Sequence, residues 1–247
     1  MIADEKSPRR RFLGHSRGLA GLVVAFAPGL RLVDLALAKP DDQAVTDSVR
    51  WGMLVDTTRC SSGCDACVSA CSSEHGLGVS DAPEIDAQWI RKVDLVDRHS
   101  GRQLSLPLMC LHCEDAPCVA VCPTGASFRR DDGIVLVNKH TCIGCRYCMM
   151  ACPYKARSFI HINVSGQLAH SPRGKGTVEG CTFCVHRVDA DRAPACVEAC
   201  STAGHHALLF GNLSDSGGEL ARRLAEEPSS ALRSDLATNP RVRHRGV

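Results

Sequence analysis

The sixteen cysteines are the feature that most constrains what this 247-residue chain can fold into. They fall into four groups of four, and no cysteine stands outside a group. Each group repeats one plan, in which a close pair or triplet of cysteines is followed by a C-x3-C step. The groups are Cys60, Cys64, Cys67 and Cys71; Cys110, Cys113, Cys118 and Cys122; Cys142, Cys145, Cys148 and Cys152; and Cys181, Cys184, Cys196 and Cys200.

The third group has the most specific spacing, C-x2-C-x2-C-x3-C-P. In bacterial ferredoxins this run binds a [4Fe–4S] cluster. Three thiolates must converge from one tight turn, and Gly144 gives that turn the backbone freedom to approach a cluster. The fourth cysteine of such a run binds the other cluster in two-cluster ferredoxins. Pro153 then ends the run, because proline cannot continue a hydrogen-bonded ladder.

Other uses of these thiols fit the spacing less well. A zinc site made of four thiolates favours two separated C-x2-C pairs. Disulfides between cysteines this close would be strained, and a nucleophilic cysteine needs one thiol rather than sixteen. The other three groups vary the ferredoxin spacing by insertions, the longest being eleven residues between Cys184 and Cys196. A structural protein built on thiolate-bound zinc therefore stays open as an alternative.

The composition agrees with a metal-stabilised fold. Aromatic residues make up only 4% of the chain, although they normally supply much of a buried core. Metal sites can compensate, because a binding energy that exists only in the folded state stabilises folding. A net charge of +2 does not suggest nucleic acid as a partner. The sequence also lacks paired carboxylates or a nucleophile–base pattern, so we expect no catalytic residue in this chain.

The first 38 residues have the pattern of an export signal. Arg9 and Arg10, followed by Phe12 and Leu13, resemble a twin-arginine signal. The uncharged run 18–30 is shorter than the roughly 20 residues of a membrane span and fits a signal-peptide core. Small residues at 36–38 place the predicted cleavage after Ala38. The twin-arginine route implies that a folded protein crosses the membrane, so an exported chain need not use its cysteines in disulfides.

Residues 50–212 resemble the four-cluster ferredoxin-like subunits of membrane-bound respiratory oxidoreductases. They are most similar to the exported iron–sulfur (O) subunits of the transmembrane complexes associated with dissimilatory sulfite reductase. The likeness lies in five stretches: WGMLVDTTRC (51–60), MCLHCEDAPCVAVCPTGASFRRDDGIVLV (109–137), CIGCRYCMMACPYKARSF (142–159), RGKGTVEGCTFC (173–184) and ACVEAC (195–200).

This resemblance implies four [4Fe–4S] clusters, each held by three cysteines of one group and one of another. The implied ligand sets are Cys60, Cys64, Cys67 and Cys200; Cys71, Cys181, Cys184 and Cys196; Cys110, Cys113, Cys118 and Cys152; and Cys122, Cys142, Cys145 and Cys148. The implied fold class is α+β, with two ferredoxin-like lobes that each bind two clusters.

The expected organisation follows the cysteine groups. The signal peptide (1–38) and a linker (39–50) precede a segment with the first group and an insertion (51–108). A central two-cluster ferredoxin-like domain (109–165), the fourth group completing the outer lobe (166–212) and a C-terminal helix and tail (213–247) follow. We predict strands at 51–56, 89–96 and 133–137, a helix at 65–74, and a solvated tail at 241–246. His112, Tyr154 and Asp56 are expected to have structural or cluster-shielding roles.

The predicted function is electron transfer, without catalysis by this chain. The resemblance implies a periplasmic subunit on the outer face of the inner membrane, attached through a partner only. Its implied neighbours are a polytopic quinone-interacting membrane subunit and a c-type cytochrome subunit, in dissimilatory sulfur metabolism. The alternative is the electron-transfer beta subunit of a molybdopterin oxidoreductase acting on polysulfide, tetrathionate, formate or nitrogen oxides.

Overall fold

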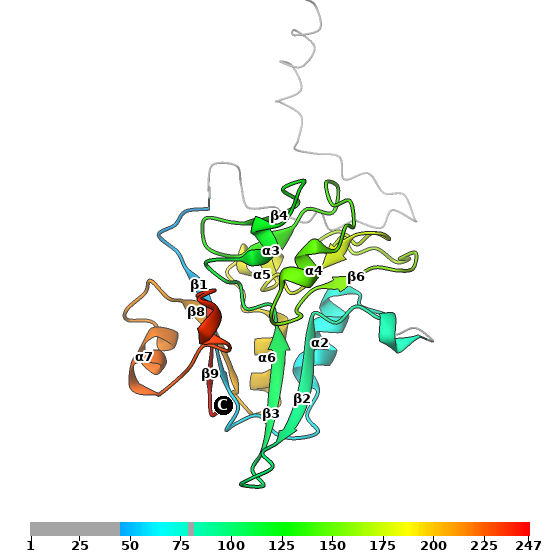
Figure 1. Ribbon diagram of the computed structural model, residues 1–247. Helices are drawn as coiled ribbons and strands as arrows, with labels where there is room; N and C mark the ends of the chain where they lie inside the picture. The colour runs from blue at the N-terminus through cyan, green and yellow to red at the C-terminus, as the bar shows by residue number, and fades with distance from the viewer. Residues whose placement is uncertain (1–44, 79–81) are drawn as a thin grey trace, which may run out of the picture. The chain divides into compact units, whose positions relative to one another are not determined.

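The computed structural model describes residues 45–78 and 82–247 (Figure 1). The predicted signal peptide and the first part of the predicted linker lie outside the described residues. All described residues belong to one unit, Ala36–Val247, and its division into smaller domains stays a prediction. Over these ranges no helix combines the length and the hydropathy that crossing a bilayer requires.

A three-stranded sheet contains the predicted first strand. β1 (Trp51–Asp56) lies in the middle, antiparallel to β8 (Leu208–Asn212) and parallel to β9 (Val242–Arg245). Met53 faces Phe210 on one side and Val242 on the other. A central strand with both edges paired is covered by protein, and Met53, Leu54 and Val55 are accordingly at most 1% exposed.

The prediction of a solvated tail at 241–246 is wrong, because β9 completes this sheet. Val242 and His244 are buried, whereas Arg243 and Arg245 alternate with them and are only partly buried. Arg241 is also buried and forms an ion pair with Glu114 at 2.5 Å. The backbone of β1 needs hydrogen-bond partners along its second edge, and β9 supplies them. The many arginines of this segment hide its strand pattern in the sequence.

Three antiparallel hairpins account for the other strands. They are β2 (Ile90–Val96) with β3 (Gln103–Met109), β4 (Ser127–Arg129) with β5 (Val135–Val137), and β6 (Ser158–Phe159) with β7 (Val178–Glu179). The predicted strands at 89–96 and 133–137 are confirmed as β2 and β5. β3 escaped prediction because Pro107 interrupts it, which a two-stranded ribbon with a free edge tolerates.

Most helices are short and carry or adjoin cysteines. They are α2 (Ala66–His75), α3 (Pro117–Ala120), α4 (Tyr147–Ala151), α5 (Val185–Val188), α6 (Ala195–Thr202) and α7 (Glu219–Glu226), with single-turn 3-10 helices at Pro83–Ile85 and Ser234–Leu236. The predicted helix at 65–74 is confirmed as α2. α6 packs beside α2, and α2 also packs against β2 of the β2–β3 hairpin (Figure 1).

The core is built around thiols. Of the 33 buried apolar residues described, ten are cysteines. The main cluster places Cys67, Cys71, Cys196 and Cys200, from α2 and α6, against the buried side chains of the central sheet. Aromatic rings form two stacked pairs in this region, Trp51 with Phe210 and Phe183 with His112. The result is a mixed α/β fold of small sheets in which loss of the cysteine sites would remove much of the core.

Asp56 fixes the loop between β1 and the first cysteine. Burial alone would raise the pKa of its carboxyl, but hydrogen bonds from Thr58 and Arg245 outweigh burial and lower the pKa. Arg223 of α7 also contacts this carboxylate, at 3.4 Å. The prediction that Asp56 has a structural role is confirmed by these contacts.

We expect Asp56→Ala to lower the free energy of unfolding by about 3 kcal/mol, because it removes a buried carboxylate that accepts hydrogen bonds from Thr58 and pairs with Arg223 and Arg245, which then keep only Glu227. Since its pKa is lowered on folding, this contribution is present at neutral pH and is lost as the pH falls below about 3.8. Denaturant titration of the metal-loaded protein measures the change. Asp235→Ala, which removes an exposed ion pair with Arg233, serves as the control and should change stability little.

Candidate metal centres

The fold gathers the sixteen thiols into four sets, and in each set three cysteines of one sequence group meet one cysteine of another. We call these sets sites A, B, C and D. Site A consists of Cys60, Cys64, Cys67 and Cys200, and site B of Cys71, Cys181, Cys184 and Cys196. Site C consists of Cys110, Cys113, Cys118 and Cys152, and site D of Cys122, Cys142, Cys145 and Cys148.

The electrostatics of the thiols define the outer two sets. Burial, followed by the charges of Cys60, Cys200 and Cys64, raises the pKa of Cys67 to about 11. Burial and the nearby Cys181 and Cys184 raise the pKa of Cys71. The pKa of Cys196 is raised well above its usual value by burial and then by Cys184 and Cys71. Sites A and B therefore exchange their fourth cysteines.

The inner two sets follow the same rule. Burial raises the pKa of Cys110 to about 12 despite the lowering effect of Arg157, and Cys118 and Cys152 add to the increase. The pKa of Cys113 rises to about 11 from burial, again with contributions from Cys118 and Cys152. At site D a single small cavity is lined by all four cysteines of the set. These sets are the ones that the family resemblance implies, and their role as cluster ligands stays a prediction.

Helical spacing explains how one element serves two sites. α2 carries Cys67 and Cys71, and α6 carries Cys196 and Cys200, each pair four residues apart. Residues i and i+4 lie on one helix face, one above the other. Each helix therefore offers one thiol to site A and one to site B. The C-x3-C step at the end of every group is the sequence signature of this arrangement.

The sites lie in a row. Cys67 of site A is an electrostatic neighbour of Cys71 and Cys196 of site B. Cys181 of site B is a neighbour of Cys110 of site C. Cys118 of site C is a neighbour of Cys148 of site D. The order is thus A, B, C, D.

The two ends of this row are the most accessible. Cys60 and Cys64 of site A are partly exposed, and Cys145 of site D is exposed. All four cysteines of site C, and three of the four at site B, are buried. Protein therefore shields the middle of the row, while a partner can approach either end.

The thiols fit iron–sulfur clusters. None of the sixteen forms a disulfide, and thiols whose pKa values are raised by burial and by one another become ligands when a cationic metal takes the place of their protons. Backbone N–H groups donate to sulfur atoms of the sets: Ser127 to Cys122 at 3.3 Å, Ala207 to Cys200 at 3.2 Å, and Val178 to Cys142 at 3.5 Å. Hydrogen bonds of this kind are used to tune [4Fe–4S] clusters. Structural zinc sites take their four ligands from two nearby pairs. They give no reason for two neighbouring sites to take their fourth cysteine from each other's sequence group.

Gly144 shapes the loop of site D, as its predicted role requires. Its φ is +69°, and a Cβ atom there would lie 2.1 Å from the carbonyl oxygen of Gly176. We expect Gly144→Ala to displace the loop and to lower the iron content of site D substantially. Gly166→Ala is a matched control, because φ is +65° and nothing lies within 4 Å of the added atom. Equal iron loss in both variants would show that backbone strain rather than the Gly176 contact is responsible.

Several side chains other than cysteines contact the sets, and Arg157 and His75 are two of them. Arg157 donates a hydrogen bond from Nη2 to Sγ of Cys118 at 3.2 Å. His75, at the end of α2, places Nε2 3.3 Å from Sγ of Cys184 and Nδ1 3.1 Å from Oγ of Ser171. Arg157 follows Cys152 by five residues and His75 follows Cys71 by four, but only the tertiary structure shows that they contact Cys118 and Cys184.

The structural role predicted for His112 is confirmed. It is fully buried, accepts a hydrogen bond from the Val135 N–H at 3.0 Å and stacks on Phe183. Tyr154 packs against Cys110 and Cys152 of site C, and burial raises the pKa of its hydroxyl. Its hydroxyl lies 2.5 Å from Oγ1 of Thr238.

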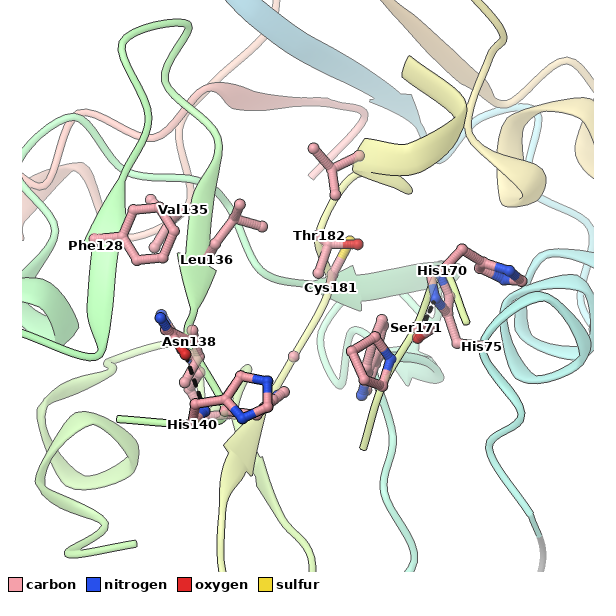
Figure 2. Close-up of a pocket in the computed structure, with 17 residues that line it drawn as sticks. His75, Phe128, Val135, Leu136, Asn138, His140, His170, Ser171, Cys181 and Thr182 are labelled. Carbon is pink, nitrogen blue, oxygen red and sulfur yellow. Dashed lines mark hydrogen bonds between the residues drawn. The ribbon is translucent and has the colours of Figure 1, made fainter. Parts of the chain in front are cut away.

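A cavity of about 300 Å³ opens beside site B. Figure 2 shows the segment with Cys181 and Thr182 between β5 residues on one side and His75, His170 and Ser171 on the other.

Glu74, His170 and His186 near this region have ligand atoms within 4.8 Å of one another. Glu74 already pairs with His186 at 2.7 Å and Arg187 at 3.4 Å, so we interpret the group as an ion-pair network that joins α2 to α5.

A chain with four tetrathiol sets in a row defines a polycluster ferredoxin-type protein. Residues 102–211 match the family model of the 4Fe-4S dicluster domain. The chain is 38% identical to the Hdr-like menaquinol oxidoreductase iron-sulfur subunit 1 of Archaeoglobus fulgidus, covering 95% of this chain and 96% of the relative. It is 34% identical to a tetrathionate reductase subunit of Salmonella typhimurium, over 98% and 89%, and 38% identical to protein NrfC of Escherichia coli, over 79% and 80%. The chain therefore belongs to the 4Fe–4S dicluster ferredoxin-type iron–sulfur subunits of respiratory oxidoreductases, which transfer electrons.

Proposed function

We propose that this chain holds four [4Fe–4S] clusters, one at each of sites A to D, in two ferredoxin-like lobes. In this proposal it is a periplasmic subunit that relays electrons between a quinone-interacting membrane subunit and periplasmic redox partners in dissimilatory sulfur metabolism. The observation that carries the proposal is the linear order of the sites, with the most accessible cysteines at the two ends. When bound, each cluster supplies a one-electron redox couple.

In this proposal the protein provides a path for electrons along sites A to D and a contact surface for a partner at each end. Burial of sites B and C keeps water away from the middle of the row. The C-x3-C steps of α2 and α6 keep sites A and B adjacent, and the exchange between α3 and α4 does the same for sites C and D. A protein with these features needs no catalytic residue, because the chemistry takes place on its partners.

The face around site D suits a protein partner with an apolar surface. Ile143, Tyr147 and Met150 flank Cys145 and Cys148 in sequence and are 66%, 54% and 70% exposed. Large apolar side chains gathered at an exposed cysteine mark an interaction site. The polytopic membrane subunit is the partner that we assign to this face, because its surface chemistry is the most apolar of the proposed neighbours. A c-type cytochrome subunit would then complete the complex.

The names of two relatives point to different neighbours. The name of the Archaeoglobus relative supports a link to menaquinol. The name of the Salmonella relative, a tetrathionate reductase subunit, supports the alternative, in which the chain serves a molybdopterin oxidoreductase as its beta subunit. The two functions share the iron–sulfur chain and differ in the cofactor of the neighbouring subunit.

The test is the cofactor content of the complex that co-purifies with the tagged protein from native membranes in mild detergent. Covalent haem without molybdenum is the expected result. Molybdenum or tungsten in stoichiometric amount would instead support the molybdopterin alternative. Zinc without iron in the purified chain would overturn both functions.

A further inference from the structure

A buried arginine lies between sites C and D. Arg157 follows the third cysteine group and is 7% exposed. Its Nη2 donates to Sγ of Cys118 at 3.2 Å and to Oγ of Ser127 at 3.1 Å. Ser127 in turn donates its backbone N–H to Sγ of Cys122 at 3.3 Å. The guanidinium therefore contacts a thiol of site C directly and lies one residue away from a thiol of site D.

Arg157 differs from the other buried arginines in what balances its charge. Arg187 pairs with Glu74 and Glu198, and Arg241 pairs with Glu114. Within residues 45–78 and 82–247, no carboxylate lies within ion-pairing distance of Arg157. A buried cation without a partner is costly, so the charge of the two thiolate sets must balance it.

The local backbone is shaped to hold this side chain. Lys155 has a φ of +51°, which turns the chain after Cys152 and Pro153. Gly180 lies alongside, and a Cβ there would be 2.7 Å from the carbonyl oxygen of Ala156 and 3.4 Å from Cδ of Arg157. A side chain at Gly180 would therefore collide with the backbone that leads into Arg157.

We infer that Arg157 is a positioning residue that raises the reduction potential of the cluster at site C and, to a smaller extent, that of site D. This inference rests on the proposed function, because it assumes that both sites hold clusters. Reduction adds negative charge to a cluster, and a fixed buried cation stabilises the more negative state. A hydrogen bond to a ligand sulfur acts in the same direction. Site C has both effects, whereas site D has the charge alone.

The experiment is a potentiometric titration followed by electron paramagnetic resonance, with iron content measured on the same samples. Arg157→Gln should keep the iron of the native protein. At a fixed potential it should lower the ratio of reduced to oxidised cluster at one site at least tenfold, equivalent to about 59 mV for a one-electron couple. Arg157→Lys, which keeps the charge, should restore most of the difference. A merely structural role would not separate these two variants.

Several outcomes would overturn the inference. One is full iron in Arg157→Gln with all midpoint potentials unchanged. If Arg157→Gln loses iron, Arg157→Met decides, because it removes the charge and both hydrogen bonds while keeping an unbranched side chain in the buried site. A fall of the site C midpoint in Arg157→Met supports the inference, whereas a midpoint equal to that of the native protein overturns it. If the native protein itself lacks four clusters, the proposed function fails instead, which separates the two failures.

Discussion

Replacing Cys152 by alanine should remove about a quarter of the iron, and the lost cluster should be that of site C. Cys152 follows the three cysteines of site D in sequence, yet it lies beside Cys110 and Cys113. Loss of one thiolate of four leaves an open coordination position at a buried site, which destabilises the whole cluster. Iron analysis and electron paramagnetic resonance of the purified variant measure the loss.

Double variants show which cysteines share a cluster. Cys152→Ala combined with Cys118→Ala should lose no more iron than either single variant, because both residues belong to site C. Cys152→Ala combined with Cys148→Ala should lose about half, because two sites are affected. The opposite pattern, in which Cys152 and Cys148 behave as one unit, would mean that each group binds its own cluster.

Removing all clusters should unfold most of the protein. Ten of the 33 buried apolar residues are thiols, and without metal their sites lose the energy that holds α2, α6 and the loops of sites C and D together. We expect chelation under oxidising conditions to abolish cooperative thermal unfolding and to expose Trp89, which is now 4% exposed. Circular dichroism and tryptophan fluorescence measure both changes.

Reconstitution is the control for this second experiment. Iron and sulfide added with a reductant should restore the native spectra, which rules out irreversible damage as the cause. A metal-free protein that still unfolds cooperatively, within a few degrees of the loaded protein, would contradict the prediction. In that case the sheet around β1 would be stable by itself.

The sequence predicted what depends on local spacing. β1, α2, β2 and β5 follow from short apolar runs and from cysteines four residues apart. β9 could not be predicted in this way, because its stability comes from pairing with a strand far away in sequence, and its arginines mask the apolar alternation. β3 was hidden by Pro107, whose missing N–H matters only in a strand with two paired edges.

The same distinction between local and long-range features applies to the candidate sites. The cysteine groups are visible as motifs, whereas the contacts of Arg157 and His75 with cysteine sulfur depend on packing between distant segments. Arg157 reaches Cys118 across 39 positions and His75 reaches Cys184 across 109. The sulfur atom that each residue contacts belongs to another cysteine group, so the contacts that adjust a site are harder to predict than the cysteines that form it.

The position of β9 also has a consequence for biosynthesis. Arg245 bonds to Asp56 across 189 positions, so the central strand gains its second neighbour only after residue 245 has been synthesised. A nascent chain can present all sixteen cysteines and still have one edge of β1 unpaired. A label or substitution within residues 241–245 would therefore disturb folding more than its sequence distance from the cysteines suggests.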